Sequence, residues 1–338
     1  ATSGPNGGLS AYRIGPDAGL TLIDYAHYQP SISSDVMDRL TLLSTADGPQ
    51  LVVAGNGDGQ LTAYDLDPSG MINTAGVISG IAGPSSAVLA LNQSGVDRLF
   101  LANGGDGAIQ AYSIDGPTQI AQQFSVQDTA TTYAAAVFAL ETVSIGGADY
   151  LLSASTTDQG VTAYRIETSG LSASGNLGAT DGIGIMTPTT LATVAMGGRH
   201  FVLLGSAASD GIGQSGVITV MELGADGSLS LTDHVMDTTQ TRFGLIQSLD
   251  VIEANGFTYV IAAGGDDGLT LFVLMPHGRL QMIDMVFDDF GIGLENVTDM
   301  AAFHDGDTLR LFAASQMSAG VTELSLDTSR NGSVLVAV

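Results

Sequence analysis

The chain has 338 residues, of which 35 are acidic and 9 basic, and its formal net charge at pH 7 is −26. A field this negative repels nucleic acids and anionic membrane surfaces, so we exclude both as partners; basic protein surfaces and cations are favoured. Cysteine is absent, which excludes disulfides and thiol chemistry, and every basic residue is Arg, which excludes covalent chemistry on Lys. No apolar run is long enough to span a membrane.

One short pattern recurs along the whole chain. A Gly at the end of a turn is followed by alternating apolar and polar residues, and successive copies begin 48 to 56 residues apart. The copies lie at 8–12, 59–64, 107–112, 160–164, 216–220, 268–272 and 320–324. A repeat of about 40–50 residues made only of short strands is typical of β-propeller blades.

Four strands fit into one repeat. In the last repeat we expect them at 297–303, 308–314, 320–326 and 333–338, separated by turns rich in Gly, Asp and Asn. No segment has helical periodicity with caps, so the predicted fold is an all-β, seven-bladed propeller of four-stranded antiparallel blades in a single domain, 1–338. The predicted repeats are 1–34, 35–82, 83–131, 132–186, 187–244, 245–295 and 296–338.

The first repeat is incomplete at its N-terminus. Residues 8–14 match the third strand of a blade and residues 20–26 the fourth, with only seven residues before them. Either another segment fills the first two strand positions or the native chain begins further upstream. We expect the upstream segment, because the sequence starts within an element and without Met.

The segments that join one repeat to the next are where a binding site is expected. They should gather on one rim of the propeller around its central channel, where loops are free to vary. Carboxylates there could bind Ca²⁺ through oxygen ligands. The alternative is that an acidic protein simply has acidic loops. The candidate ligands are Asp128, Asp181, Asp237, Asp288 and Asp289.

Other residues give weaker indications of a site. His27, which lies among aromatic residues, and Arg242 are candidate ligand contacts on the same rim. The Gly/Asp turns, such as 55–59 and 265–268, are expected on the opposite rim, where tight hairpins explain them. No nucleophile elbow, phosphate loop or paired His motif is present, so the sequence indicates no catalytic residue and no certain cofactor.

The strings Leu99–Ala102 with Gly107–Tyr112, and Tyr259–Ala262 with Gly268–Phe272, resemble two groups of bacterial propellers. One is the lactonase-like (YVTN-type) seven-bladed family, and the other is the propeller region of secreted RTX, or hemolysin-type calcium-binding, proteins. The lactonase resemblance implies a cleft that acts on a cyclic ester. The RTX resemblance implies an acidic secreted protein without Lys or Cys.

These observations lead to one preferred function and one alternative. The preferred one is a non-catalytic extracellular propeller, a structural or protein-interaction module of a secreted or surface assembly that binds other subunits or surface polymers. The alternative is a lactonase-like hydrolase or isomerase with its site at the channel mouth. The sequence therefore leans against an enzyme, and places the protein outside the cell or on its surface.

Overall fold

The computed structural model describes residues 8–15, 19–27, 39–45, 48–54, 61–81, 85–93, 96–103, 107–116, 118–208, 215–288, 292–318, 320–329 and 334–337. Nearly all regular structure in these residues is β-strand, and the helical part is a short 3₁₀ turn, η1 (Ala179–Asp181). The predicted all-β class is confirmed. No helix in the described part of the chain is long and apolar enough to cross a membrane.

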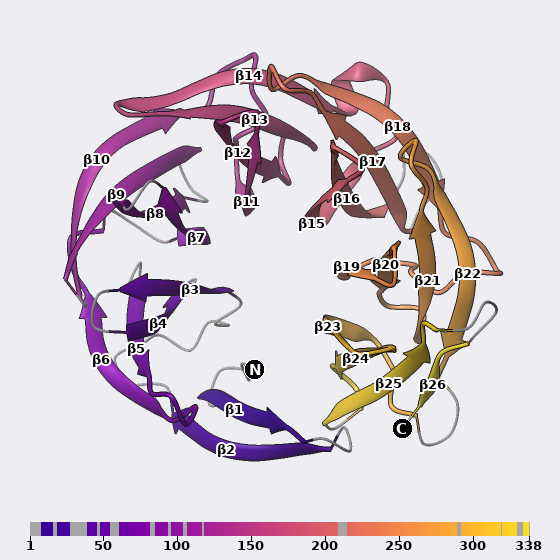
Figure 1. Ribbon diagram of the computed structural model, residues 1–338. Coiled ribbons are helices and arrows are strands. Elements are labelled where there is room, and N and C mark those ends of the chain that lie inside the picture. Colours follow the sequence, from indigo (N-terminus) through magenta and orange to yellow (C-terminus); the bar gives the residue numbers. More distant parts are fainter. Residues whose placement is uncertain are drawn as a thin grey trace. The chain divides into compact units, whose positions relative to one another are not determined.

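The described strands form six four-stranded antiparallel sheets and one two-stranded sheet (Figure 1). Within each four-stranded sheet the strands lie in sequence order, which is the meander of a propeller blade. The first two sheets are β3 (Arg39–Thr45), β4 (Gly48–Ala54), β5 (Leu61–Leu66), β6 (Ile72–Ile78), and β7 (Ser85–Gln93), β8 (Val96–Asn103), β9 (Ala108–Gly116), β10 (Gln119–Gln127). The next two are β11 (Val137–Ile145), β12 (Ala148–Ser155), β13 (Gly160–Glu167), β14 (Gly170–Gly178), and β15 (Met186–Met196), β16 (Arg199–Ala208), β17 (Val217–Leu223), β18 (Leu229–Met236). The last two are β19 (Ser248–Ala254), β20 (Phe257–Ala263), β21 (Gly268–Leu274), β22 (Leu280–Phe287), and β23 (Val297–Asp305), β24 (Thr308–Ser315), β25 (Val321–Asp327), β26 (Val336–Ala337).

The two-stranded sheet is the incomplete first repeat. It consists of β1 (Gly8–Ile14) and β2 (Leu20–His27), within one residue of the predicted strands. The Gly at the start of β1 corresponds to the Gly that begins the third strand of the other repeats, so β1 and β2 occupy third and fourth strand positions. A complete seventh blade stays a prediction.

The chain divides into two compact units, which we describe separately. Unit 1 comprises residues 1–130, 134–140 and 167–171, and unit 2 comprises residues 131–133, 141–166 and 172–338. Unit 1 holds the sheets from β1 to β10, and unit 2 holds the sheets from β15 to β26 together with most of β12 and β13.

The second strand of sheet β19–β22 is buried on both faces, which explains its apolar run from Tyr259 to Ala263. In β20, Val260 and Ala262 belong to the core shared with sheet β15–β18, whereas Ile261 and Ala263 belong to the core shared with sheet β23–β26. Alternate residues of a strand point to opposite faces, so a strand between two sheets must be apolar at every position.

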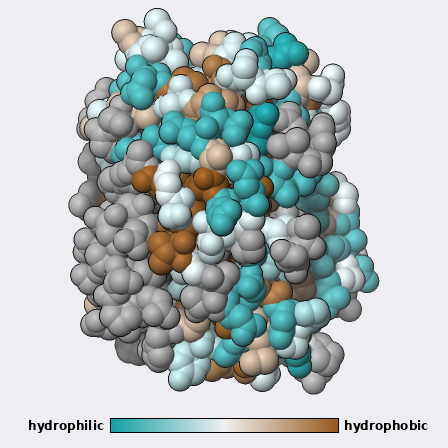
Figure 2. Space-filling view, turned by 90° about the vertical axis from the view of Figure 1, so that its left-hand side faces the viewer, coloured by the Kyte–Doolittle hydropathy of each residue, from teal (hydrophilic) through white to brown (hydrophobic). Residues whose placement is uncertain are grey.

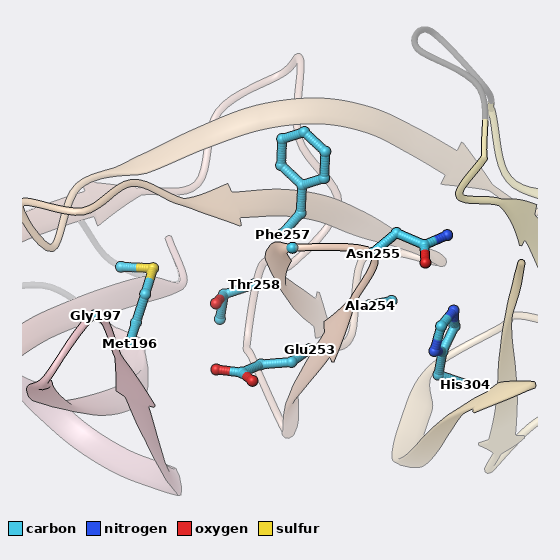
Figure 3. A pocket seen from close by; sticks show the side chains of 9 residues that line it. Met196, Gly197, Glu253, Ala254, Asn255, Phe257, Thr258 and His304 are labelled. Carbon is cyan, nitrogen blue, oxygen red and sulfur yellow. The ribbon is translucent and has the colours of Figure 1, made fainter. Parts of the chain in front are cut away.

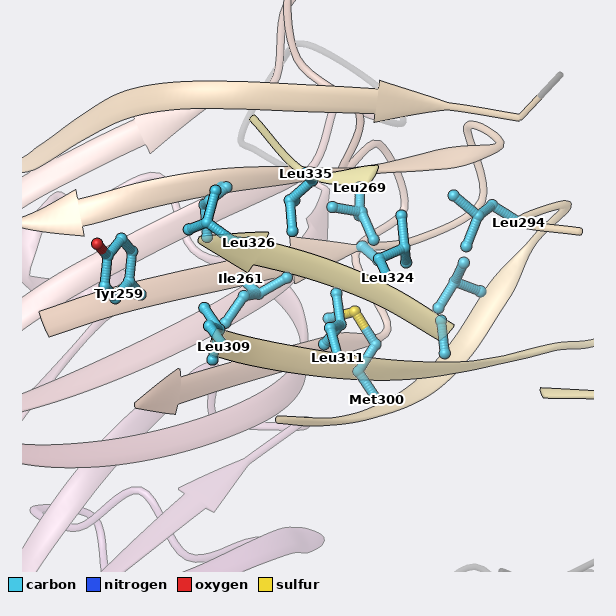
Figure 4. Close-up of a cluster of buried hydrophobic side chains, with 14 of the residues drawn as sticks. Tyr259, Ile261, Leu269, Leu294, Met300, Leu309, Leu311, Leu324, Leu326 and Leu335 are labelled. Atoms are coloured by element: carbon cyan, nitrogen blue, oxygen red, sulfur yellow. The ribbon is translucent and has the colours of Figure 1, made fainter. Parts of the chain in front are cut away.

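Aliphatic side chains fill the space between neighbouring sheets. The core between sheets β19–β22 and β23–β26 is made mainly of Leu, Ile, Val and Ala, with Met300 and Tyr259 at its margins (Figure 4). Each fully buried Leu or Ile contributes roughly 1.5–3 kcal/mol to folding. Aliphatic side chains therefore supply most of the packing free energy between these two sheets.

Carboxylates also connect neighbouring sheets, through backbone N–H groups about one repeat further on. The fourth-strand residues Asp24, Asp233 and Asp284 each accept such a bond, from Ile72 (2.9 Å), Leu280 (2.8 Å) and Leu335 (2.6 Å) respectively. Their other oxygen accepts the N–H of the next residue in the chain. We call these residues the fourth-strand Asp staples.

A β-bulge places each staple. The pairing register of the third and fourth strands shifts just before Asp24, Asp233 and Asp284, leaving Ile23, Thr232 and Ile283 without a direct partner. A bulge turns the strand locally and re-aims the side chain that follows it. The Asp side chain can then reach the neighbouring sheet rather than point into solvent.

In the coloured part of the face shown in Figure 2, hydrophilic residues are widespread and hydrophobic residues lie in small separate patches. Scattered apolar side chains on a surface are ordinary for a folded protein, and only a large continuous patch would indicate a docking surface.

We expect Asp233→Ala to lower the free energy of unfolding by about 2 kcal/mol, because it leaves the N–H of Leu280 without its charged acceptor. Asp226→Ala is the matched control, since Asp226 accepts bonds only from Ser228 in its own exposed turn. Urea unfolding of both variants measures the difference. Equal losses in the two variants would contradict a stapling role.

Candidate functional site

The strands of each sheet begin and end on two opposite sides of the sheet, which we call its edges. The two edges carry different loops. Because the strands are antiparallel and in sequence order, the connections between sheets share one edge with the turns from second to third strand. We call it the connection edge, and the opposite one the hairpin edge. The N–H of Gly265, in such a turn, donates to the carbonyl of Gly244, in such a connection, at 2.8 Å. The expectation that the Gly/Asp turns lie on the opposite rim is therefore wrong for the turn 265–268, and the turn 55–59 lies outside the described residues.

Three of the predicted metal ligands have the same local role. Asp128, Asp237 and Asp288 each follow a fourth strand, and each carboxylate accepts the backbone N–H of the residue six positions later, at 2.7–3.2 Å. A carboxylate in this position satisfies a backbone donor of the connection and fixes its path into the next sheet. These residues lie in three different sheets' connections.

The other predicted site residues are placed as follows. Asp181, in η1, accepts the N–H of Gly178 (2.8 Å) and the hydroxyl of Tyr133 (3.2 Å). Asp289 and the side chain of His27 lie outside the described residues. No group of three His, Asp or Glu side chains in the described part of the chain is placed to hold a metal ion. Calcium binding by these carboxylates stays a prediction.

Arg242 lies in the connection between β18 and β19, and its backbone is held by the sheet that this connection leads into. Its N–H donates to the hydroxyl of Thr270 on β21 at 2.7 Å, and its Nη1 donates to the carbonyl of Thr241 at 3.0 Å. The same backbone anchor occurs in an earlier repeat, where Tyr133 donates to Thr162. In both of these repeats the anchoring Thr follows the repeat Gly by two residues.

Beside Arg242 lie two carboxylates that face a single glycine. A Cβ atom placed on Gly244 would lie 3.3 Å from Oδ2 of Asp237 and 3.3 Å from Cγ of Asp266. Asp237 comes from the end of β18 and Asp266 from the turn between β20 and β21. Any side chain at position 244 would press on both carboxyl groups. We call Asp237, Arg242, Gly244 and Asp266 the Asp266 cluster.

Asp266 has an unusual environment in this cluster. Burial raises its pKa to about 6, the negative charge of Asp237 adds to the rise, and the Gly244 N–H and Arg242 oppose it. Its Oδ1 is buried, and no described group donates a hydrogen bond to it. A buried carboxylate oxygen without a donor is costly, and perturbed acids of this kind are concentrated at functional sites.

A chain of amide side chains continues along the connection edge. Nε2 of Gln247 donates to Oδ1 of Asn296 at 2.8 Å, and Nδ2 of Asn296 donates to Oε1 of Gln316 at 2.5 Å. The backbone N–H of Asn296 donates to the carboxylate of Asp267, next to Asp266 in the same turn, at 3.1 Å. The turn that carries Asp266 is thus anchored to the start of sheet β23–β26.

The backbone at this edge is strained in a repeated way. Ala136, Thr187, Leu245 and Asn296 all have left-handed conformations, with φ between 50° and 53°, close to where a first strand begins. For residues other than Gly this costs on the order of 1–2 kcal/mol each. Leu245 directly follows Gly244, so one of these strained positions adjoins the Asp266 cluster.

Three further carboxyl groups lie on first strands. Burial raises the pKa of Glu141, on β11, to about 7. Burial also raises the pKa of Asp250 on β19 and of Asp299 on β23, and repulsion from Asp299 contributes at Asp250. Asp250 accepts the backbone N–H of Ala302 on β23 at 2.6 Å, which gives it a structural role like that of the fourth-strand Asp staples.

A depression of about 410 Å³ lies on the hairpin edge of unit 2 (Figure 3). Its walls include Met196, Glu253, Phe257 and His304. Asn255 also lines it, and Nδ2 of Asn255 donates a hydrogen bond to the hydroxyl of Thr328 at 2.8 Å. None of the buried polar atoms that lack a partner in the described part of the chain belongs to this lining. We therefore place the candidate site at the Asp266 cluster, where a buried carboxylate oxygen without a described donor lies beside a second carboxylate and a guanidinium group.

Sequence reasoning found part of this site and missed its central residue. Asp237 and Arg242 were identified because they lie in a connection. Asp266 was assigned to a tight hairpin turn, and the turn was expected on the other rim. The signal that could have found it is strand order alone, because antiparallel strands bring every second turn to the edge that carries the connections.

No known protein family matches the chain, and no curated protein matches it by sequence. Solved structures do match its fold. A protein from Lactobacillus plantarum is 16% identical with a TM-score of 0.65, covering 95% of this chain and 88% of its own. The periplasmic gluconolactonase PpgL of Pseudomonas aeruginosa is 20% identical with a TM-score of 0.59, covering 98% of both chains. A candidate 6-phosphogluconolactonase from Bacteroides uniformis is 14% identical with a TM-score of 0.68, covering 97% of this chain and 90% of its own.

These matches define the class of the chain as a β-propeller whose fold is similar to that of lactonase-like propellers. They also correct the preferred function. The sequence favoured a non-catalytic structural or interaction module, but the solved structures with this fold include proteins described as lactonases. The preference was wrong because it rested on the lack of a known catalytic motif, which does not separate a non-catalytic propeller from the lactonases that have a similar fold.

We expect Glu141→Gln to stabilise the protein increasingly as the pH rises from 5 to 8. The pKa of Glu141 is raised by burial to about 7, so the wild type loses stability as the pH rises through the range between the unfolded and folded pKa values. The Gln variant has no charge to bury, and its advantage should reach roughly 3 kcal/mol above pH 7. Urea unfolding at pH 5 and pH 8 measures it; a difference that does not change with pH would contradict the burial of this carboxyl group.

Proposed function

We propose that the protein is a lactonase-like hydrolase that opens a cyclic ester at the Asp266 cluster. The similarity of its fold to proteins described as a gluconolactonase and a 6-phosphogluconolactonase supports this class of reaction. The observation that carries the choice of site is Asp266, which has a buried oxygen without a described donor and lies beside a second carboxylate and a guanidinium group.

The side chains of the cluster have the chemistry that ester hydrolysis requires. As a carboxylate, Asp266 takes a proton from water while the water oxygen bonds to the carbonyl carbon of the lactone. The ring C–O bond then breaks, and the ring oxygen receives the proton from Asp266, which leaves a hydroxy acid. Arg242 can bind the carbonyl oxygen as negative charge develops on it, or the carboxylate of the product.

Asp266→Asn should lower kcat/KM for lactone hydrolysis by about 100-fold to 10,000-fold, because the variant keeps the shape of the side chain but cannot accept the proton. The measurement is acid release from a panel of five- and six-membered lactones, corrected for spontaneous hydrolysis. Asp226→Asn, in an exposed turn, is the control and should keep full activity. Equal activity in Asp266→Asn and the wild type would exclude this residue as the base.

The pH dependence of the wild type provides a separate test. Asp266 acts as a base only when it is deprotonated, and its pKa is raised to about 6. We therefore expect kcat/KM to rise with pH up to about 6 and then to level off. A profile that is already flat at pH 4 to 5 would contradict a base with this pKa.

We also propose that the protein acts outside the cytoplasm. The periplasmic location of PpgL and the acidic composition without Lys or Cys support this, as does the resemblance to RTX-associated propellers. Partner subunits, surface polymers and calcium remain proposals of the same kind. Fractionation of the native cells into cytoplasm, periplasm and medium tests the location, and recovery in the cytoplasm alone would overturn it.

Calcium binding by the carboxylates of the connection edge should raise the melting temperature. A ligand that binds only the folded state stabilises it in proportion to the logarithm of its concentration. Thermal unfolding in EDTA and in millimolar CaCl₂ tests this, with MgCl₂ as the control for ionic strength. A melting temperature that is the same in all three would exclude a calcium site.

A further inference from the structure

The depression on the hairpin edge of unit 2 is formed by three neighbouring sheets (Figure 3). Met196 and Gly197 come from the end of β15 and the turn that follows it, residues 253–258 from the hairpin of β19 and β20, and His304 from β23. Its volume of about 410 Å³ is in the range of sites that hold one small molecule. It lies on the opposite edge of the sheets from the Asp266 cluster.

Glu253 supplies the one carboxylate of the described lining, and its charge is not neutralised there. No hydrogen bond or ion pair involves its side chain in the described part of the chain. The lining contains no Arg, and Arg199, which follows the turn after β15, is already paired with Glu222. In Figure 3 the carboxylate of Glu253 points to the side of the depression where Met196 and Thr258 lie.

The other polar side chains at this place present acceptors. Nδ2 of Asn255 donates both to Oδ1 of Asp307 at 3.2 Å and to the hydroxyl of Thr328 at 2.8 Å, so its Oδ1 is left as an acceptor. The hydroxyl of Thr328 gives its single hydrogen to the carbonyl of Asp307, at 2.8 Å. Nε2 of His304, 3.4 Å from that hydroxyl oxygen, must then be the donor of the pair. Neutral His304 therefore keeps Nδ1 as an acceptor.

Two apolar side chains complete the lining. Phe257 is 47% exposed, and its ring lies 6.2 Å from the ring of Tyr259. The face of an aromatic ring attracts a cation that lies within about 6 Å of its centre. The thioether of Met196 is a polarisable surface on which methylene groups pack well. The depression therefore suits a ligand with a positively charged donor group and a short apolar stem.

We propose that this depression binds a small aliphatic amine in its ammonium form. An ammonium group donates up to three hydrogen bonds and accepts none, which complements an unpaired carboxylate and neighbouring acceptors. The carboxylate of Glu253 binds the ammonium group, the ring of Phe257 lies against it, and Met196 contacts the methylene stem. This site is independent of the proposed hydrolysis, because the negative charge of Glu253 repels the carboxylate of a hydroxy acid.

The test is a titration of the full chain with n-butylammonium chloride, followed through the backbone amide signals of residues 253–258 in NMR spectra. We expect saturable shifts of these signals, which neither NaCl at the same ionic strength nor neutral n-butanol produces. Glu253→Gln should weaken binding by at least about 10-fold, because the variant keeps the shape of the side chain and loses its charge. Phe257→Ala should weaken it by about twofold to fivefold.

Asp226→Asn is the matched control, because Asp226 is an exposed carboxylate on the hairpin edge of the same unit. It removes the same charge from a protein whose net charge of −26 attracts cations to its whole surface. It should change the affinity by less than about twofold. Equal weakening in Glu253→Gln and Asp226→Asn would overturn the proposal. Equal shifts with n-butylammonium and n-butanol, or no saturable shift in the wild type, would overturn it as well.

Discussion

Sheet β19–β22 has to bury both of its faces, and several other features of this protein follow from that requirement. Its second strand, β20, is an apolar run from Tyr259 to Ala263 because one set of side chains packs on the preceding sheet and the other set on the following sheet. Polar and charged side chains therefore lie mainly at the two edges of the sheets and at a few positions within them, such as those of the fourth-strand Asp staples. Several acidic residues within the sheets have specific partners, such as Asp233 with the N–H of Leu280, whereas Asp266 and Glu141 are the costly exceptions.

The sequence predicted the architecture well because that architecture is a repeated local pattern. Strand alternation and turn residues recur in every copy, so single errors at one turn do not affect the whole assignment. The predicted strands of the last repeat begin at or within a few residues of β23, β24, β25 and β26. The short first repeat was also read correctly, because the Gly that begins β1 identifies its place among the four strands.

The candidate site was predicted only in part, since it depends on which turns meet at one edge. Asp237 and Arg242 follow from their position in a connection. Asp266 and Gly244 form a site only through a contact between segments more than 20 residues apart. This contact is recognised in the structure because Gly244 has little room for a side chain and because a buried oxygen of Asp266 has no described donor. The raised pKa of Asp266 depends first on burial, a property that a sequence pattern does not report.

The spacing of the fourth-strand Asp staples has a consequence for how such a chain can arise. Acceptor and donor are about one repeat apart, as for Asp24 with Ile72 and Asp284 with Leu335. A gene segment encoding a repeat with such an Asp, as sheet β19–β22 shows, therefore carries an acceptor for its successor and a donor for its predecessor. When that segment is duplicated in tandem, each new copy can form these hydrogen bonds with both neighbouring copies without any compensating mutation. The number of repeats can therefore increase one repeat at a time, and the hydrogen bonds between neighbouring sheets are kept.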